Sequence, residues 1–267
     1  MNRNIFIAAI ILSFYLIAGP ARAADSFILI SDVDDTVKIT DVHNRDNLSC
    51  NVVAGKLVFS GMPELYAHLL GENSPVERLM FLSGAPFIFS FNLRKLLNDA
   101  HFPAFNLTLS GATDLFSSHY EYKTKHMKEL YGAAEGYNFI LIGDDTEYDP
   151  EVYANFSTTF KQNKVIAIYI HRITGRNLPQ DSIAFVTAYD IAMHEFLADH
   201  LSEKQTADVG EDVLKSEDVN FLPDFQQCPK GYEQIAGLPE NLAQLKKKIE
   251  DRIMTICSSR TKALKEQ

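Results

Sequence analysis

Between residues 24 and 198, five short apolar runs alternate with longer segments of mixed polarity. Each run has about the length of a β-strand and is apolar at nearly every position, and the runs occupy residues 27–30, 79–82, 105–109, 139–142 and 165–170. Strands of alternating polarity bury one face of a sheet, whereas strands that are apolar throughout are buried on both faces. The runs therefore predict a parallel sheet covered by helices on both sides.

The segments between these runs have the residue spacing of helices. Pro63 stands where proline is favoured in the first turn of a helix, and Leu65 and Leu69 follow at helical intervals. Similar spacing occurs in residues 87–100, 123–131 and 150–160. Part of residues 37–78 is expected to be helix, so only a small flap or hairpin fits between the first two strands. Because strand and helix alternate, the chain is predicted to form an α/β doubly wound domain. Such domains bind ligands beyond the carboxyl ends of their strands, so polar residues at those ends are candidates for a functional site.

An acidic cluster follows the first apolar run directly. Asp32, Asp34 and Asp35 lie within four residues of one another, immediately after a strand that is predicted to be buried. Carboxylates this close repel one another unless a cation or a reaction uses their charge, and an all-oxygen ligand set suits Mg²⁺. The alternative for this cluster alone is a solvated acidic turn or a helix N-cap.

Two weaker polar signals lie between the first and the fourth run. Ser83 and Gly84 follow the second run and offer a hydroxyl group and a backbone N–H to an oxyanion or a phosphate, although a plain turn is the simpler reading. Lys123 begins a helical stretch just after Tyr122, where its charge would neutralise phosphate. Lys125 is its rival, and Lys123 is favoured because of its place at the expected start of the helix.

A second acidic cluster follows the fourth run. Asp144 and Asp145 come directly after Gly143, which is expected to let the backbone turn sharply, and Asp149 follows four residues later. Because the carboxyl ends of parallel strands share one edge of a sheet, the two clusters are expected to meet there. Together they would hold one Mg²⁺, with Ser83 and a lysine completing a phosphate site.

These motifs, in this order, resemble those of the haloacid dehalogenase-like (HAD) superfamily of phosphotransferases. More narrowly, the stretches SDVDDTVKIT, GMPELY and LIGDDTEYDPEVY resemble the catalytic domain of the actin-patch-associated phosphatidate phosphatases, over roughly residues 27–173. That family often has Asn-Ser after the motif serine and Ser after the first aspartate of the last motif. This chain has Gly84-Ala85 and Asp145 at those places, which bears on substrate specificity.

The resemblance implies a role for each candidate residue. Asp32 would attack phosphorus and form an aspartyl-phosphate, and Asp34 would protonate the leaving alcohol and then deprotonate water. The metal ligands would be Asp32, the backbone carbonyl of Asp34, Asp144 and Asp149, although Asp149 would alternatively hold a metal-bound water. The phosphate ligands would be Ser83, the Gly84 N–H and Lys123. Thr36 is expected to orient the first loop. Asp35 and Asp145 would either support the metal ligands or cap helices, and helix caps are favoured.

The resulting hypothesis is an exported, Mg²⁺-dependent phosphatase of phosphomonoesters, with phosphatidate as the first substrate candidate. A phosphatase of soluble monoesters, such as nucleotides or sugar phosphates, and a non-catalytic phosphate-binding module are the alternatives. The formal net charge of −10 argues against a nucleic-acid partner, and it gives anionic membranes no general attraction. A lipid substrate at a membrane surface would therefore need a local means of contact.

The N-terminus has the pattern of a secretory signal peptide over residues 1–23. Arg3 precedes an apolar run from residue 5 to residue 18, and Ala21-Arg22-Ala23 forms a cleavage site of small residues. The alternative is an uncleaved N-terminal anchor. If the signal peptide is cleaved, the mature protein is expected in the periplasm or outside the cell. No second apolar run is long enough to span a membrane, so no transmembrane segment is expected in the mature chain.

Beyond a catalytic domain at residues 24–200, the sequence predicts an extension over residues 201–267. Its polar stretch at 203–217 is expected to be a linker or a loose helix, and residues 239–257 an amphipathic helix packed on the domain rather than on a membrane. The chain has three cysteines, which allow at most one internal pair, and export would permit it. The pairing among Cys50, Cys228 and Cys257 is open.

Overall fold

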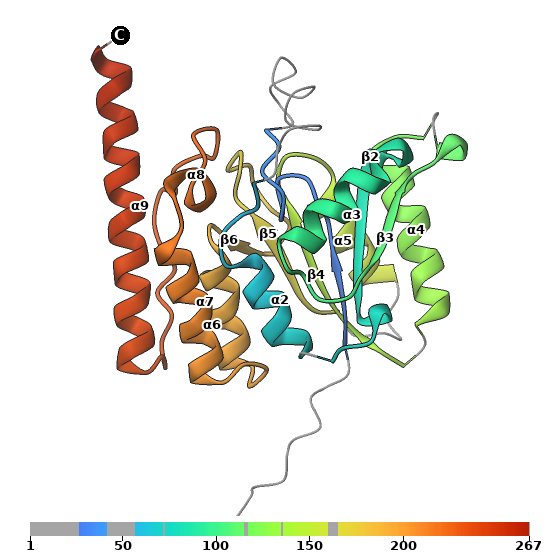
Figure 1. Ribbon diagram of the computed structural model, residues 1–267, viewed down its shortest axis with the longest axis horizontal. Coiled ribbons are helices and arrows are strands. Elements are labelled where there is room, and N and C mark those ends of the chain that lie inside the picture. Colours follow the sequence, from blue (N-terminus) through green and yellow to red (C-terminus); the bar gives the residue numbers. More distant parts are fainter. Residues whose placement is uncertain are drawn as a thin grey trace, which may run out of the picture.

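The computed structural model describes residues 27–41, 57–71, 73–114, 117–134, 136–159 and 165–266. Within these ranges, six strands form one parallel sheet in the order β3-β2-β1-β4-β5-β6 (Figure 1). The strands are β1 (Phe27–Ser31), β2 (Leu79–Pro86), β3 (Asn106–Ser110), β4 (Asn138–Asp144), β5 (Val165–His171) and β6 (Ile183–Phe185). The doubly wound α/β fold and all five expected strands are confirmed. β6 was not predicted, because three residues are too few to show a period.

Helices connect the strands and continue beyond the sheet. They are α2 (Met62–Leu70), α3 (Ser90–Asp99), α4 (His119–Ala133), α5 (Asp149–Thr159), α6 (Ala188–Leu197), α7 (Glu203–Lys215), α8 (Asp218–Phe221) and α9 (Glu240–Glu266). The helices expected between the strands are all present. The segment 87–100 is divided into a 3-10 turn, η2 (Phe87–Phe89), and α3. Helix α6 was not predicted.

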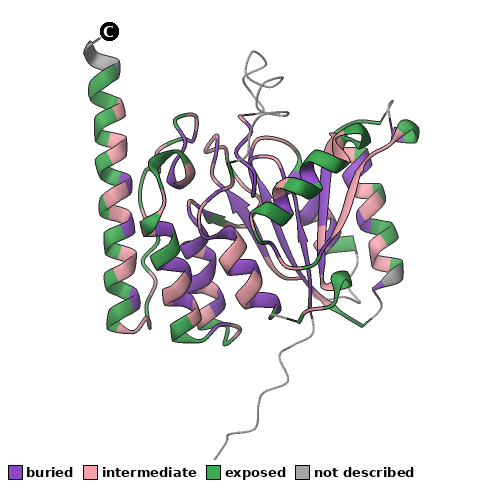
Figure 2. Cartoon of the chain, in the orientation of Figure 1, coloured by how far each residue is buried: buried purple, intermediate pink, exposed green. Residues whose placement is uncertain are grey.

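The central strand shows why the runs are apolar at every position. Phe27 and Leu29 of β1 belong to one hydrophobic core, with residues of α2, α3 and α6, whereas Ile28 and Ile30 belong to another, with residues of α4 and α5. Successive side chains of a strand point to opposite faces, and here each face carries a layer of helices. Figure 2 shows the strands as the buried centre of the molecule.

The polar segment at 203–217 contains a regular helix, α7, and not a linker. Ser202 caps it and forms a capping box with Gln205, while Val209 and Val213 are fully buried. Gly210 lies against the ring of Tyr189, where an added Cβ would come within 2.7 Å of the ring. The apolar stripe of α7 is narrow and includes a glycine, so the composition of the segment concealed its packing role.

The long helix α9 packs on this layer, as the sequence predicts. Leu242, Ile249 and Ile253 are buried, and Arg252 donates to the carbonyl of Ser216 after the end of α7 at 2.7 Å. Cys257 of α9 forms a disulfide with Cys228, so one of the three open pairings is observed.

Several sequence-based expectations fall outside the described residues. These are the signal peptide at 1–23, Cys50, and residues 42–56 of the region in which a small flap is expected. Among the helices of the described ranges, none combines the length and the apolar character that crossing a membrane requires.

Candidate active site

Both acidic clusters lie at the carboxyl edge of the central strands, and the structure brings them together. Ser31 of β1 pairs with Ile142 of β4, and the backbone N–H of Asp32 donates to the Ile142 carbonyl at 2.9 Å. This register places Asp32 beside Asp144, and Asp149 follows at the start of α5. One carboxylate oxygen from each of these three aspartates lies within 4.8 Å of the others, and all three side chains are buried.

Lys123 reaches into this cluster from α4. Its Nζ donates to Asp32 Oδ1 at 2.7 Å and to Asp149 Oδ1, and only 2% of the residue is exposed. Lys125 instead points outward, with half of its side chain exposed, and pairs with Asp114 at 3.1 Å. The two lysines therefore lie on different faces of α4, and only Lys123 faces the carboxylates.

The charge in the cluster is unbalanced. Burial disfavours the ammonium ion, but the nearby carboxylates of Asp149 and Asp32 outweigh it and hold the pKa of Lys123 well above its ordinary value. Burial raises the pKa of Asp32 well above its ordinary value, although Lys123 opposes this, and burial together with Asp149 does the same for Asp144. One ammonium ion cannot satisfy three buried carboxylates.

A divalent cation fits this donor set. The donor atoms are all carboxylate oxygens, they are close enough to share one ion, and their residual negative charge is buried. Hard cations such as Mg²⁺ select such ligands, and the ion would favour the charged forms that burial disfavours. Asp32, Asp144 and Asp149 are therefore the side chains that could hold a metal.

Asp34 lies outside the cluster of three and is held by different partners. Its carboxylate accepts hydrogen bonds from the Thr40 hydroxyl at 2.8 Å, from Lys38 Nζ at 3.2 Å and from the Ser83 hydroxyl at 3.2 Å. The side chain lines a pocket of about 370 Å³ that Asp32 and Asp144 also line. A carboxylate placed beside the cluster but not in it is free to exchange protons with a ligand in this pocket.

Gly84 lines this pocket and Ser83 lies beside it, in a backbone setting that differs from the expected one. Strand β2 continues to Pro86 with a register shift after Ser83, so the pair does not form a turn before a helix. The Ser83 hydroxyl donates to Asp34 and accepts from the Ala85 N–H at 3.0 Å. Gly84 lies under the ring of His119, where a Cβ would be 3.3 Å from the ring.

The pocket is also lined by four residues that were not predicted from the sequence, namely Lys38, Thr40, and the pair of His119 with Glu147. Lys38 is 2% exposed, and His119 Nδ1 lies 2.7 Å from Glu147 Oε2 at the pocket. A signal for the first two was present, because polar and apolar residues alternate from Val37 to Thr40 and such a segment turns every second side chain to one side. Nothing in the sequence marks the second pair.

Asp35 and Asp145 were expected to cap helices, and this expectation is wrong. Asp35 accepts the backbone N–H groups of Thr40 and Asp41, each at 2.9 Å, and has a positive φ of 55°. Asp145 accepts the N–H groups of residues 173–175 at 2.7 to 2.8 Å. Both side chains are fully buried and organise loops at the site rather than helix ends.

Two small residues complete the arrangement of the acidic loops. The Thr36 hydroxyl lies 3.2 Å from Asp144 Oδ2 and 3.5 Å from Asp32 Oδ2, so it bridges the loops. Gly143 belongs to β4 and does not turn the chain, contrary to expectation. Its role is to leave space, because a Cβ there would lie 2.6 Å from Asp149.

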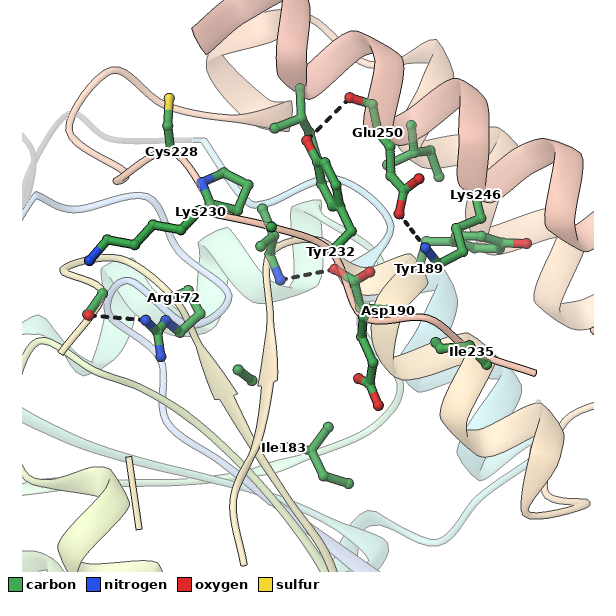
Figure 3. Close-up of a pocket in the computed structure, with 18 of the residues that line it drawn as sticks. Arg172, Ile183, Tyr189, Asp190, Cys228, Lys230, Tyr232, Ile235, Lys246 and Glu250 are labelled. Atoms are coloured by element: carbon green, nitrogen blue, oxygen red, sulfur yellow. Dashed lines mark hydrogen bonds and ion pairs between the residues drawn. The ribbon is translucent and has the colours of Figure 1, made fainter. Parts of the chain in front are cut away.

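A second cavity, of about 430 Å³, lies away from these carboxylates between β6, α6 and α9 (Figure 3). Several of its charged side chains have partners of their own. Lys246 pairs with Glu250, Arg172 donates to the Gly175 carbonyl at 3.0 Å, and Asp190 accepts two N–H groups at the start of α6. No cluster of potential metal ligands in the described residues includes them. The pocket at Asp32 and Asp34 is therefore the better candidate for chemistry.

A doubly wound α/β sheet with a buried carboxylate cluster and a buried lysine at its carboxyl edge defines a class of proteins suited to binding a cation and an anionic group together. Comparison with known families narrows this class. Residues 27–172 match the family model described as "Phosphatidate phosphatase APP1, catalytic domain". The match covers more than half of the chain, and the chain belongs to this family.

The chain is also similar to a curated protein. The chain is 31% identical over 151 residues to phosphatidate phosphatase APP1 of Saccharomyces cerevisiae (strain ATCC 204508 / S288c). The alignment covers 53% of this chain and 25% of the yeast protein, so the chain spans about a quarter of the length of its relative. No solved structure matches the chain.

Proposed function

We propose that this protein is a metal-dependent phosphatase of phosphomonoesters and that phosphatidate is its leading substrate. The observation that carries the proposal is the buried cluster of Asp32, Asp144 and Asp149 around Lys123, beside a pocket that also contains Asp34. Membership of the phosphatidate phosphatase family supports it.

In the proposed reaction Asp32 is the nucleophile. One of its oxygens forms a bond to phosphorus as the bond to the leaving oxygen breaks, and Asp34 donates a proton to that oxygen, which leaves as an alcohol. Asp34 then takes a proton from water, whose oxygen attacks phosphorus and releases Asp32 and inorganic phosphate. The hydrogen bonds from Thr40, Lys38 and Ser83 keep the Asp34 carboxylate oriented for both transfers.

The proposed cofactor is Mg²⁺. Asp32, Asp144 and Asp149 would hold it, together with the Asp34 backbone carbonyl that the HAD-like pattern implies. When bound, Mg²⁺ would neutralise the charge of the phosphoryl group, which is most of what catalysis of phosphoryl transfer requires. Lys123 adds a fixed positive charge and favours the ionised form of Asp32.

Export through residues 1–23 is part of the proposal. The disulfide between Cys228 and Cys257 supports it, because such bonds persist in oxidising compartments and are rare in the cytosol. The periplasm and the extracellular space both fit.

A substrate panel with metal control tests the proposal. The purified chain is assayed with phosphatidate in mixed micelles and with soluble nucleotide and sugar monoesters, with and without a chelator. We expect release of phosphate that requires Mg²⁺, is fastest with phosphatidate, and is abolished by Asp32→Asn. Undiminished turnover by Asp32→Asn would refute the assigned nucleophile, and faster turnover of the soluble esters would replace the substrate.

A further inference from the structure

Three large apolar side chains are unusually exposed at one place on the surface. Phe87, Ile88 and Phe91 are 68%, 76% and 77% exposed, whereas the next most exposed large apolar residues of the described chain, Tyr148 and Met254, are each 49% exposed. All three lie within five residues, on η2 and the first turn of α3. We call this group the 87–91 ridge.

The ridge is continuous with the apolar part of the active-site pocket. Pro86 precedes it and lines the pocket, and Phe89 and Leu93, which alternate with the ridge residues, line the pocket as well. The same short segment therefore turns one set of side chains toward the carboxylates and the other set toward solvent. The apolar residues that line the pocket are therefore neighbours in sequence of the exposed residues of the ridge.

Contiguous apolar exposure of this kind marks a contact surface. Among possible occupants, a lipid surface is the one that the neighbouring site favours. The phosphate of a membrane phospholipid lies in the headgroup layer and its acyl chains lie in the bilayer, so a pocket that takes the phosphate must lie against the membrane. Aromatic side chains are also favoured at that interface.

The charge of the chain makes an apolar contact necessary. With a net charge of −10, the protein gains no general attraction to anionic lipids. On α3 itself, the exposed Lys95 is paired with Asp99 at 2.7 Å, and the Arg94 guanidinium lies 5.9 Å from the centre of the Phe105 ring. Burial of the ridge in acyl chains would supply binding free energy that electrostatics does not.

We propose that the 87–91 ridge inserts into a phospholipid surface and sets the active-site pocket against the headgroup layer. The inference rests on the proposed phosphatase function for its choice of partner. The bound state leaves Asp32 and Asp34 facing the headgroup phosphate, while Phe89 and Leu93 contact the part of the lipid nearest to it.

Vesicle binding by the full chain tests this proposal. The chain contains no tryptophan, so Phe87→Trp introduces a single reporter. Its emission should shift to the blue when phosphatidylcholine vesicles containing phosphatidate are added, at low and at high salt alike. Met254→Trp, on the exposed side of α9, is the matched control and should show no shift.

A second pair of variants measures the contribution of the ridge. Phe87→Ser with Phe91→Ser should weaken vesicle binding by about 100-fold, from roughly tenfold for each apolar side chain withdrawn from lipid. Its hydrolysis of phosphatidate in vesicles should fall, and its hydrolysis of a soluble monoester should not, because neither residue lines the pocket. Val219→Ser with Met254→Ser, which removes two partly exposed apolar side chains elsewhere, should change none of these.

The results separate the two proposals. Unaltered vesicle binding by the double serine variant, or a fall in its oligomeric state with vesicle binding retained, would overturn the lipid contact and assign the ridge to another occupant. A third result is that the unsubstituted protein binds vesicles but hydrolyses no phosphomonoester, while the double serine variant no longer binds vesicles. In that case the lipid contact stands and the phosphatase function fails.

Discussion

Substitution of Lys123 by methionine is expected to show how strongly the acidic site depends on one cation. Methionine has nearly the same length, so packing changes little, but the two hydrogen bonds to Asp32 and Asp149 are lost. Removal of one partner from a buried ion pair costs about 3–5 kcal/mol, because the remaining charge is buried without compensation. Lys123 is 2% exposed and donates to two carboxylates, so we expect its loss to cost an amount within this range. We expect the free energy of unfolding, measured by urea titration with far-ultraviolet circular dichroism, to fall by about that amount.

The comparison with Lys125→Met makes this measurement specific. Lys125 lies two residues away on α4, carries the same charge and is half exposed, so its loss should leave the urea midpoint almost unchanged. Turnover of a phosphomonoester should fall by about 100-fold or more in Lys123→Met only. Adding Asp149→Asn to Lys123→Met should restore part of the stability, because it removes one of the uncompensated charges. Equal effects of the two lysine variants, or no recovery in the double variant, would refute this account of the site.

Other variants address the remaining parts of the site. In Asp144→Asn one buried negative charge is gone, so the metal-free protein should melt at a higher temperature, while Mg²⁺ should no longer raise the melting temperature or support turnover. Gly143→Ala would place a methyl group 2.6 Å from Asp149. We expect turnover and Mg²⁺ affinity to be lost while circular dichroism shows an intact fold. Normal activity would contradict the view that Gly143 is needed to leave room for Asp149. His171 is buried and neutral, and burial lowers its pKa to about 4, against 6.5 in an unfolded chain. The unfolded state therefore binds the extra proton between these values, and stability should fall by up to about 3 kcal/mol as the pH drops from 6.5 to 4. His171→Gln should reduce that fall in a pH series of urea midpoints, and an unchanged series would argue against His171 as its source.

Much of the fold follows from the sequence because the parallel sheet leaves a strong pattern. Residues such as Ile28 and Leu29 face opposite layers and must both be apolar, so β1 to β5 are evident. Helix α7 was less evident, because its burial depends on Val209, Val213 and the small size of Gly210, which fits the ring of Tyr189. Tyr189 belongs to α6, and the local sequence of α7 does not indicate that this ring packs against Gly210.

The candidate site shows the same division. Asp32, Asp144 and Asp149 were predicted because strand ends in a parallel sheet must meet, and the structure brings their side chains together. Lys123 was predicted from an expected place at the start of a helix; α4 in fact begins at His119, but Lys123 does reach the cluster. The uses of Asp35 and Asp145 depend instead on loops that approach from elsewhere, including residues 173–175. A side chain whose partners are backbone groups distant in sequence cannot be assigned from its neighbours along the chain.

The disulfide between Cys228 and Cys257 has a practical consequence for work with this protein. It closes a loop across 29 residues, which corresponds to about 3–4 kcal/mol of stabilisation, and it fastens the segment before α9 to that helix. A thiol reductant would break this bond and remove the cross-link between α9 and the segment before it, whereas a chelator would act on the proposed metal site. A preparation made in a reducing host and one made by secretion would then differ in melting behaviour while carrying the same sequence.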